Sequence, residues 1–220
     1  MAEILNRLNE VRRGVMFIIE APSGTGKTTV VKKLLEQDKK LNWSVSVTTR
    51  APRAGEQNGV DYYFISDEEY DKLLQEDAFY EHVDSQYGSR YGTLRSEVDE
   101  FLNIGQDVLF DMDWEGMRQM KAKAPDDVVS VYLLPPSIKE LRRRLEGRST
   151  DSKEIIEKRM GLVLEKMQHW TEYDYVVICG DLDQTVDTIR QIFSAERMKR
   201  KRQIGLIEFT QKLIDEVKNG

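Results

Sequence analysis

Short apolar runs alternate along the chain with longer segments that have one polar and one apolar side. Four of the runs have the composition of strands buried on both faces, at residues 15–19, 107–111, 128–134 and 175–178. Each is followed by a segment whose apolar residues have helical spacing, at 27–35, 114–124, 138–146 and 182–198. This regular alternation predicts right-handed βαβ units around a parallel sheet.

The segment between the first predicted helix and the second core strand follows another pattern. Alternation over 43–48 predicts one strand, and shorter strands are predicted at 61–65, 79–83 and 89–93. A helix with Tyr70, Leu73 and Leu74 facing inward is expected at 67–75, and turn-forming residues fill 49–59. These short elements predict a small mixed α/β insertion at 47–94, followed by a helix at 95–103.

Further helices are expected near both ends of the chain. Residues 153–170 have the pattern of a long helix, and 3–13 that of a short amphipathic helix ended by Gly14. Ser137 is placed to cap the helix at 138–146. A basic stretch at 197–202 precedes a helical stripe made of Leu206, Phe209, Leu213 and Val217. This tail is compatible with a helix docked on the core, a dimer contact or a weak site for a polyanion.

The turn after the first predicted strand has the sequence of a phosphate-binding P-loop. A glycine-bearing loop leads into Gly26, Lys27 and Thr28 at the start of a helix. Glycines let successive backbone N–H groups face an anion, and the helix N-terminus adds its positive dipole end. Lys27 then supplies a mobile charge for the β- and γ-phosphates, and Thr28 a hydroxyl for Mg²⁺. The predicted ATP-binding residues are Ser23, Gly24, Thr25, Gly26, Lys27, Thr28 and Thr29.

Ala21 is the one departure from the P-loop pattern, which has glycine at this position. Alanine fits there if the backbone has a negative φ. The alternative interpretation is a chance turn between a strand and a helix.

Composition narrows the class of protein. The chain has 220 residues, 40% of them hydrophobic, which suffices for one large domain or a core with inserted subdomains. The net charge of −6 does not suggest a nucleic-acid partner, so a nucleotide site must gather its cations locally. The single cysteine, Cys179, fits a reducing compartment. No apolar run approaches the about 20 residues of a membrane span, so the cytoplasm is the expected location.

Ligands of open parallel sheets bind at the carboxyl ends of the strands, and two polar sets are expected to reach that edge. Asp111 can serve Mg²⁺ directly or through water, whereas Asp113 can equally be the N-cap of the next helix. The second set consists of arginines around Gly147, namely Arg143, Arg144, Arg148 and Arg159. Arginine suits a phosphoryl group that changes charge during transfer, although a solvated helix face would also explain this set.

The insertion carries a third polar set, which comprises Ser46, Arg50, Arg53, Glu56, Tyr62, Glu81, Tyr91 and Thr93. Arginines with tyrosines can hold a second phosphate group. A carboxylate accepts the adjacent N1–H and N2–H donors of guanine but is repelled by the N1 acceptor of adenine, so Glu81 with Asp113 predicts guanine. No Ser-His-Asp or Cys-His pattern is visible in the sequence, and an acceptor that is already a phosphate needs no general base.

Residues 44–62 closely resemble the GMP-binding signature of guanylate kinases. The stretch is Ser-Val-Ser-Val-Thr-Thr-Arg-Ala-Pro-Arg-Ala-Gly-Glu at 44–56 and Asn-Gly-Val-Asp-Tyr at 58–62. Supporting segments lie at 22–29, 79–81, 91–93, 109–113, 133–137 and 144–148, so that the resemblance runs from about residue 14 to residue 197. It implies phosphorylation of GMP, and of dGMP, by ATP with Mg²⁺, on a P-loop core that carries a GMP-binding subdomain and a lid.

The resemblance also implies a role for each matching position. The residues that would hold the phosphate of GMP are Arg50, Arg53, Tyr62 and Tyr91. Those that would recognise guanine or its surroundings are Ser46, Glu81, Thr93 and Asp113, while Glu56 would support the arginine loop. Lys27 matches the P-loop lysine, and the lid arginines that would act on the transferred group are Arg144, Arg148 and Arg159.

The chain departs from the family pattern on the ATP side. Glu20-Ala21 stands where Ser-Gly is usual, and Ile178-Cys179-Gly180 stands where Val-Asn-Asp is usual. Two alternatives stay open, a nucleoside monophosphate kinase of other base specificity and a non-catalytic guanylate-kinase-like interaction module. Such modules typically lose the P-loop lysine and the lid arginines, which this chain keeps.

The expected fold class is α/β, with a three-layer P-loop core around a parallel sheet, an inserted mixed α/β GMP-binding subdomain and a helical lid. The core is expected at 1–46, 95–137 and 161–197, the insertion at 47–94, the lid at 138–160 and a C-terminal helical extension at 198–220. ATP and GMP are the expected partners, without a membrane or nucleic acid, and a homodimer is an open alternative.

Overall fold

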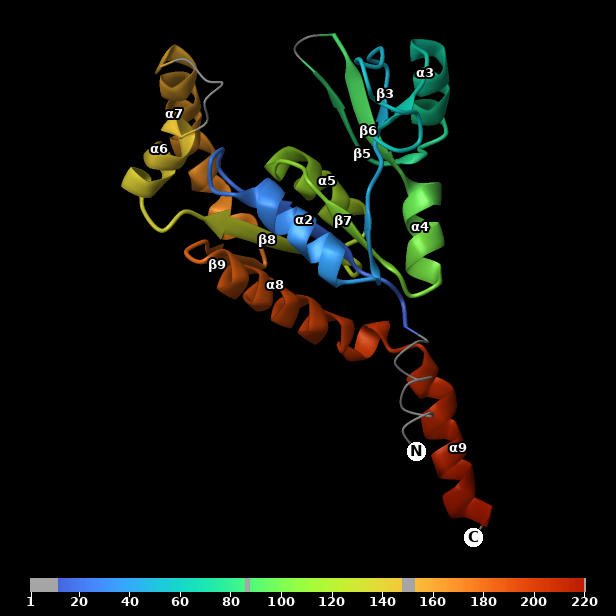
Figure 1. Cartoon of the computed structure of the whole chain (residues 1–220). Helices are drawn as coiled ribbons and strands as arrows, with labels where there is room; N and C mark the ends of the chain where they lie inside the picture. Colours follow the sequence, from blue (N-terminus) through green and yellow to red (C-terminus); the bar gives the residue numbers. More distant parts are fainter. Residues whose placement is uncertain (1–11, 86–87, 148–152, 220) are drawn as a thin grey trace.

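A five-stranded parallel sheet lies at the centre of the fold (Figure 1). The computed structural model describes residues 12–85, 88–147 and 153–219. In sheet order the strands are β2 (Leu41–Trp43), β7 (Asp107–Phe110), β1 (Met16–Glu20), β8 (Val128–Leu134) and β9 (Tyr175–Ile178). The four predicted core strands are present and every pairing in this sheet is parallel, which confirms the predicted α/β class.

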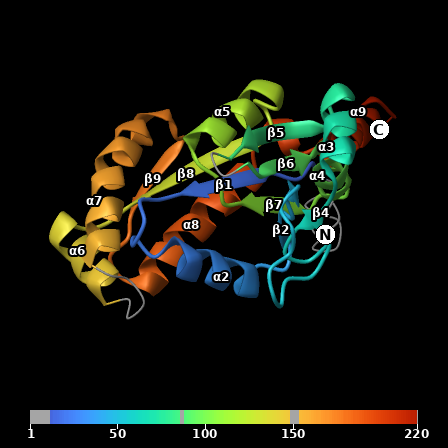
Figure 2. The ribbon, with the colours of Figure 1, turned by 90° about the horizontal axis from the view of Figure 1, so that it is seen from above.

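Helices cover both faces of this sheet, as the three-layer prediction requires (Figure 2). On one face lie α2 (Lys27–Gln37) and α8 (Leu182–Arg197), and Phe17 of β1 stacks on Phe193 with 3.6 Å between the ring centroids. On the other face, α4 (Arg95–Asn103) and α5 (Trp114–Lys123) bury a second apolar cluster with Met16 and Ile18. Alternate residues of β1 therefore point into the two halves of the core.

A second sheet is built from the predicted insertion and lies to one side of the core (Figure 1). Its order is β4 (Tyr63–Phe64), β3 (Val47–Thr48), β6 (Arg90–Leu94) and β5 (Phe79–Asp84), with both parallel and antiparallel pairs. Helix α3 (Asp67–Gln75) starts at a capping box between Ser66 and Glu69 and buries Tyr70 completely. Leu74 is 37% exposed, so the prediction that it faces inward is wrong.

The prediction of one strand over 43–48 is also wrong. Leu41–Trp43 pairs with β7 in the core, whereas Val47–Thr48 pairs with β4 and β6 in the second sheet. The Ser44 amide still donates to the Leu109 carbonyl at 3.0 Å, and the chain then crosses from one sheet to the other. A two-residue period does not say which strand a residue pairs with, so the pattern hides the change of sheet.

Two helices follow β8 at the other end of the core. They are α6 (Ile138–Glu146) and α7 (Lys153–Gln168). The Ser137 side chain accepts a hydrogen bond from the Glu140 amide at 3.1 Å, which confirms the predicted cap. The helix predicted at 153–170 ends at Gln168 and continues as a 3₁₀ turn, η1 (His169–Glu172). That residues 138–160 act as a lid stays a prediction.

The C-terminal helix α9 (Gly205–Asn219) extends away from the core (Figure 1), and none of its residues is buried. Leu213 and Val217 of the predicted apolar stripe are 44% and 83% exposed. The interpretation of this stripe as a helix docked on the core is therefore wrong. The dimer contact stays a prediction.

The basic stretch before α9 is used inside the fold. The Arg197 guanidinium donates to Asp107 at 2.6 Å, and Arg202, in the 3₁₀ turn η2 (Arg200–Arg202), is 2% exposed. These two arginines are therefore not available to a polyanion. The helix predicted at 3–13 lies almost entirely outside the described residues. Within the described ranges, no helix is both long and apolar enough to cross a membrane.

Candidate active site

The loop between β1 and α2 has the backbone conformation of an anion cradle. Gly24 and Gly26 have φ angles of +91° and +107°, a region that side-chain-bearing residues rarely adopt. A Cβ atom on Gly24 would also lie 2.8 Å from the Leu145 side chain of α6. Gly26 is the N-cap of α2, so the free N–H groups of this helix open onto the loop. The loop therefore has the geometry that the P-loop prediction requires.

Of the four arginines predicted around Gly147, Arg144 contacts the loop. Its Nη1 donates to the Thr25 carbonyl at 2.8 Å, and its Nε donates to Glu140 at 2.8 Å. Arg143 pairs with Glu140 as well, but its side chain is 73% exposed, as expected for a solvated helix face. Arg148 lies outside the described residues. Arg159 is partly buried in α7.

The P-loop lysine faces a cavity between the core and the insertion. Lys27 Nζ pairs with the Asp111 carboxylate at the end of β7. The cavity has a volume of about 340 Å³. The predicted site residues that line it are Lys27, Ser46, Tyr62, Glu81, Tyr91, Asp111 and Asp113. Side chains that are up to 86 positions apart in the chain, from Lys27 to Asp113, thus line the same cavity.

The predicted base-reading carboxylates lie on the wall of this cavity. Glu81 in β5 is 8% exposed and accepts the Thr93 hydroxyl from β6 at 2.7 Å. Its burial raises the pKa of its carboxyl group above the usual value. Asp113 is the N-cap of α5 and accepts the Gly116 amide at 3.2 Å, so the capping interpretation is correct. Since Asp113 also lines the cavity, capping leaves a binding role open.

The arginine loop of the insertion is held by Glu56. Both terminal nitrogens of Arg50 donate to this carboxylate at 2.9 Å, and the Arg53 amide donates to it at 2.7 Å. The hydrogen bonds from Arg50 lower the pKa of the Glu56 carboxyl group. The Arg50 guanidinium also lies 5.3 Å from the centroid of the Tyr62 ring, which meets Tyr91 edge-on at 5.9 Å. Glu56 thus orients the cation that the resemblance assigns to the GMP phosphate.

A second cavity, of about 210 Å³, lies on the other side of the P-loop. Cys179 and Gly180 line it together with Thr25, Gly26 and Arg144. These are the two positions at which the sequence departs from the family pattern near the last core strand. Their place beside the loop marks this cavity as a candidate for the adenine side of ATP.

Sequence reasoning missed a polar cluster beside the end of β1, formed by Glu20, Lys166 and Tyr173. Glu20 is 1% exposed, accepts the Tyr173 hydroxyl and lies 3.5 Å from Lys166 Nζ. Both Glu20 and Lys166 line the central cavity. The departure from the family pattern at Glu20 was the available signal, but its partners are about 150 positions away in the chain and belong to no motif.

The P-loop lies at the centre of a parallel sheet, and the insertion, with its own arginines and carboxylate, lies opposite it across one cavity. This arrangement is that of a P-loop nucleoside monophosphate kinase. The family model of guanylate kinase matches residues 13–196. The guanylate kinase of Zymomonas mobilis is 49% identical over 205 residues, which cover 92% of this chain and 94% of that protein. That of Novosphingobium aromaticivorans is 49% identical over 203 residues, with 92% and 91% coverage.

The crystal structure of guanylate kinase from Anaplasma phagocytophilum superposes with a TM-score of 0.68 at 36% identity and covers 90% of this chain and 94% of that one. The chain therefore belongs to the guanylate kinase family, enzymes that phosphorylate GMP with ATP. This confirms the expected enzyme class over the non-catalytic module. The role of each individual site residue stays a prediction.

Proposed function

We propose that the chain catalyses the reversible, Mg²⁺-dependent transfer of the γ-phosphoryl group of ATP to GMP and dGMP, as a step of purine nucleotide metabolism. The observation that carries this proposal is the shared cavity, in which Lys27 of the P-loop faces Glu81 and Tyr91 of the insertion. A donor and an acceptor phosphate bound from the two sides would meet near Lys27, because transfer requires the reacting groups to be adjacent.

ATP would bind with its phosphates in the loop at 23–29. The left-handed glycines and the N-terminus of α2 supply N–H donors, and Lys27 would exchange its Asp111 partner for phosphate oxygens. The Thr28 hydroxyl is exposed and the Asp111 side chain is 39% exposed, and both offer the hard oxygen donors that Mg²⁺ prefers. These two residues would hold the ion, Asp111 through a water. Bound Mg²⁺ neutralises charge on the β- and γ-oxygens.

GMP would bind on the insertion side of the cavity. Glu81 and Asp113 would accept the N1–H and N2–H donors of guanine, with Ser46 and Thr93 beside them. Arg50, Arg53, Tyr62 and Tyr91 would hold the phosphate, and Glu56 keeps Arg50 in place. Base and phosphate are common to GMP and dGMP, so both are proposed as acceptors.

Transfer would then depend on positioning and charge. The attacking oxygen of GMP is ionised at neutral pH and needs no general base. Permanently charged guanidinium groups of Arg144, Arg148 and Arg159 would stabilise the equatorial oxygens as charge redistributes in the transition state. Arg144 already lies against the loop, at 2.8 Å from the Thr25 carbonyl.

Product formation with ATP and either GMP or dGMP, measured with Mg²⁺ and again with excess EDTA, tests this proposal. We expect GDP and dGDP only with Mg²⁺. Turnover that survives EDTA would contradict the metal dependence, and a failure with dGMP would contradict the acceptor range. A cytoplasmic location, in keeping with one buried cysteine, and a homodimer are further proposals.

A further inference from the structure

Glu20 is a buried carboxylate at the boundary between β1 and the P-loop, and the mechanism above leaves it without a role. Its side chain is 1% exposed. Burial raises the pKa of its carboxyl group. A buried carboxylate is destabilising unless it is paired and hydrogen-bonded, so its partners matter.

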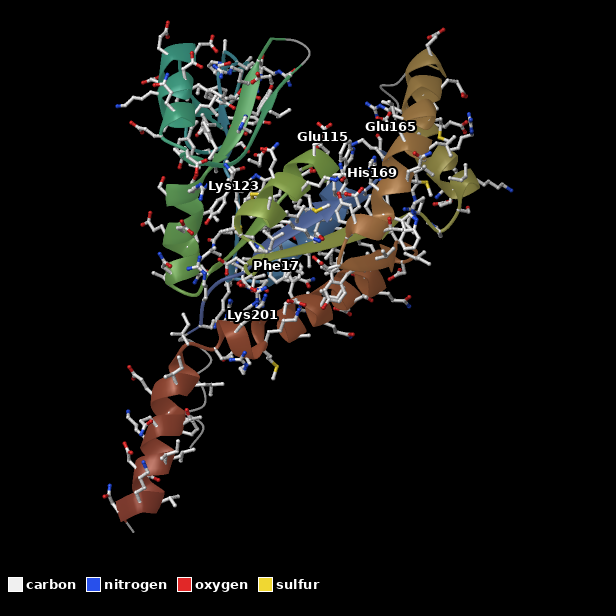
Figure 3. The ribbon with its side chains drawn as sticks, turned by 180° about the vertical axis from the view of Figure 1, so that it is seen from behind. Phe17, Glu115, Lys123, Glu165, His169 and Lys201 are labelled. Atoms are coloured by element: carbon white, nitrogen blue, oxygen red, sulfur yellow. The ribbon has the colours of Figure 1, made fainter. Side chains whose placement is uncertain are left out.

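Both partners of Glu20 come from the segment that begins with α7. The Tyr173 hydroxyl, just after η1, donates to Oε2, and Lys166 Nζ lies 3.5 Å from Oε1. The main chain of the same segment is held as well, because the Tyr132 hydroxyl of β8 donates to the Lys166 carbonyl at 2.9 Å. In Figure 3, Glu165 and His169 mark this part of the segment, opposite Glu115 on α5. The Glu20 carboxylate, at the end of β1, thus contacts the last turn of α7 and the segment just after it.

The contact between Glu20 and Lys166 lies on the same helix as Arg159. Lys166 follows Arg159 by seven residues, which is close to two helical turns and about 10 Å along the axis. Residues at this spacing lie on the same side of a helix. A change in the rotation or height of α7 at Lys166 would therefore be passed on to Arg159.

We propose that Glu20 is a positioning residue for phosphoryl transfer, because by holding Lys166 and Tyr173 it sets the placement of α7 and thereby of Arg159 relative to the P-loop. The inference rests on the proposed function only for the role of Arg159. Since Glu20 acts through another residue, its loss affects the transfer step rather than the binding of either substrate.

Glu20→Gln tests this role. The substitution keeps the size of the side chain and its acceptor for Tyr173 but removes the charge that attracts Lys166. We expect kcat to fall about 10-fold, the equivalent of one charge-assisted contact, while KM for ATP and for GMP stays within about 2-fold. Glu76→Gln is the matched control. It removes an exposed ion pair with Lys72 at the end of α3, which does not involve α7, and kcat should not change.

A double-mutant cycle with Arg159→Ala separates positioning from a merely structural effect. In the Arg159→Ala background, Glu20→Gln should cause no further loss of kcat, because the group that it positions is gone. Additive losses would overturn the inference, and so would an unchanged kcat in Glu20→Gln alone. If Arg159→Ala itself leaves kcat unchanged, the role proposed for Arg159 fails, and with it the inference that depends on it.

Lys166→Gln approaches the same contact from its half-exposed side and covers the case in which Glu20→Gln does not fold. We expect the same fall in kcat, unchanged KM values and the same non-additivity with Arg159→Ala. A raised KM for ATP or GMP in Lys166→Gln would mean that Lys166 binds phosphate itself, and would overturn the positioning role.

Discussion

Replacing Glu81 by Gln tests whether this carboxylate recognises guanine. The expected change in substrate preference follows from the contacts that Glu81 makes. The carboxylate is 8% exposed and already accepts the Thr93 hydroxyl, so an incoming base must use its remaining lone pairs. Guanine offers it N1–H and N2–H, whereas the base of IMP lacks the N2 donor. One hydrogen bond to a charged group contributes about 1.5–3 kcal/mol, which is about 10- to 150-fold in kcat/KM. The unaltered protein should prefer GMP over IMP by this factor.

In Glu81→Gln the preference should largely disappear, because the amide is uncharged and presents a donor where guanine also presents donors. The assay compares kcat/KM for GMP and IMP in both proteins. Glu97→Gln serves as the control, since Glu97 is a half-buried glutamate that accepts the Tyr63 hydroxyl at 2.9 Å, and the ratio should not change there. An equal GMP/IMP ratio in the unaltered protein and in Glu81→Gln would mean that Glu81 does not recognise guanine.

The same carboxylate predicts a pH dependence. Burial raises the pKa of Glu81, so this group takes up its proton at a higher pH than an exposed glutamate does. Lowering the pH should therefore reduce the GMP/IMP ratio in kcat/KM in the unaltered protein and leave this ratio unchanged in Glu81→Gln.

The raised pKa of Glu81 also affects the free energy of unfolding, which lowering the pH should increase. The folded state binds the proton more tightly, so the contribution of Glu81 is largest below the unfolded pKa and declines as the pH rises through the folded pKa. Glu81→Gln should remove this decline.

Three further substitutions have definite expected outcomes. Lys27→Ala should lower kcat at least about 100-fold, as for loss of a preorganised charge contact, while calorimetry shows nearly unchanged GMP affinity. Glu56→Gln should raise KM for GMP about 10-fold, because Arg50 loses its bidentate partner; an unchanged KM would separate this arginine from the GMP site. Asp107→Asn removes a fully buried carboxylate that accepts hydrogen bonds from two arginines and one amide. It should lower the free energy of unfolding in urea by about 3–5 kcal/mol, whereas the exposed control Asp126→Asn should leave it almost unchanged.

Many of the helices and strands could be predicted because each carries its own local signals. β8, β9, α3, α4 and α6 have the predicted bounds, and α6 starts at its predicted cap, Ser137. The P-loop and the insertion are equally local, since each is a continuous stretch of the chain. Seven predicted site residues from these stretches and from the end of β7 line one cavity, while Thr25, Gly26 and Thr29 line the second cavity.

What could not be predicted depends on contacts between distant parts of the chain. The crossing of residues 44–46 between two sheets follows from their strand partners, not from their own alternation. The role proposed for Glu20 depends on its contacts with Lys166 and Tyr173, which lie about 150 positions later in the chain. Arg197 and Arg202 lie in a basic stretch typical of a binding surface, yet both pair with carboxylates of the core, and Arg202 is buried.

We propose above that this site transfers the γ-phosphoryl group of ATP specifically to a guanine nucleotide. The most direct test is to incubate the full chain with ATP, Mg²⁺ and each of GMP, AMP, UMP and dTMP, and to quantify every nucleoside diphosphate by chromatography. We expect rapid formation of GDP, with ADP arising from ATP in equal amount, and little product from the other three acceptors. Faster turnover of AMP, UMP or dTMP than of GMP, or no GDP at all, would contradict this proposal.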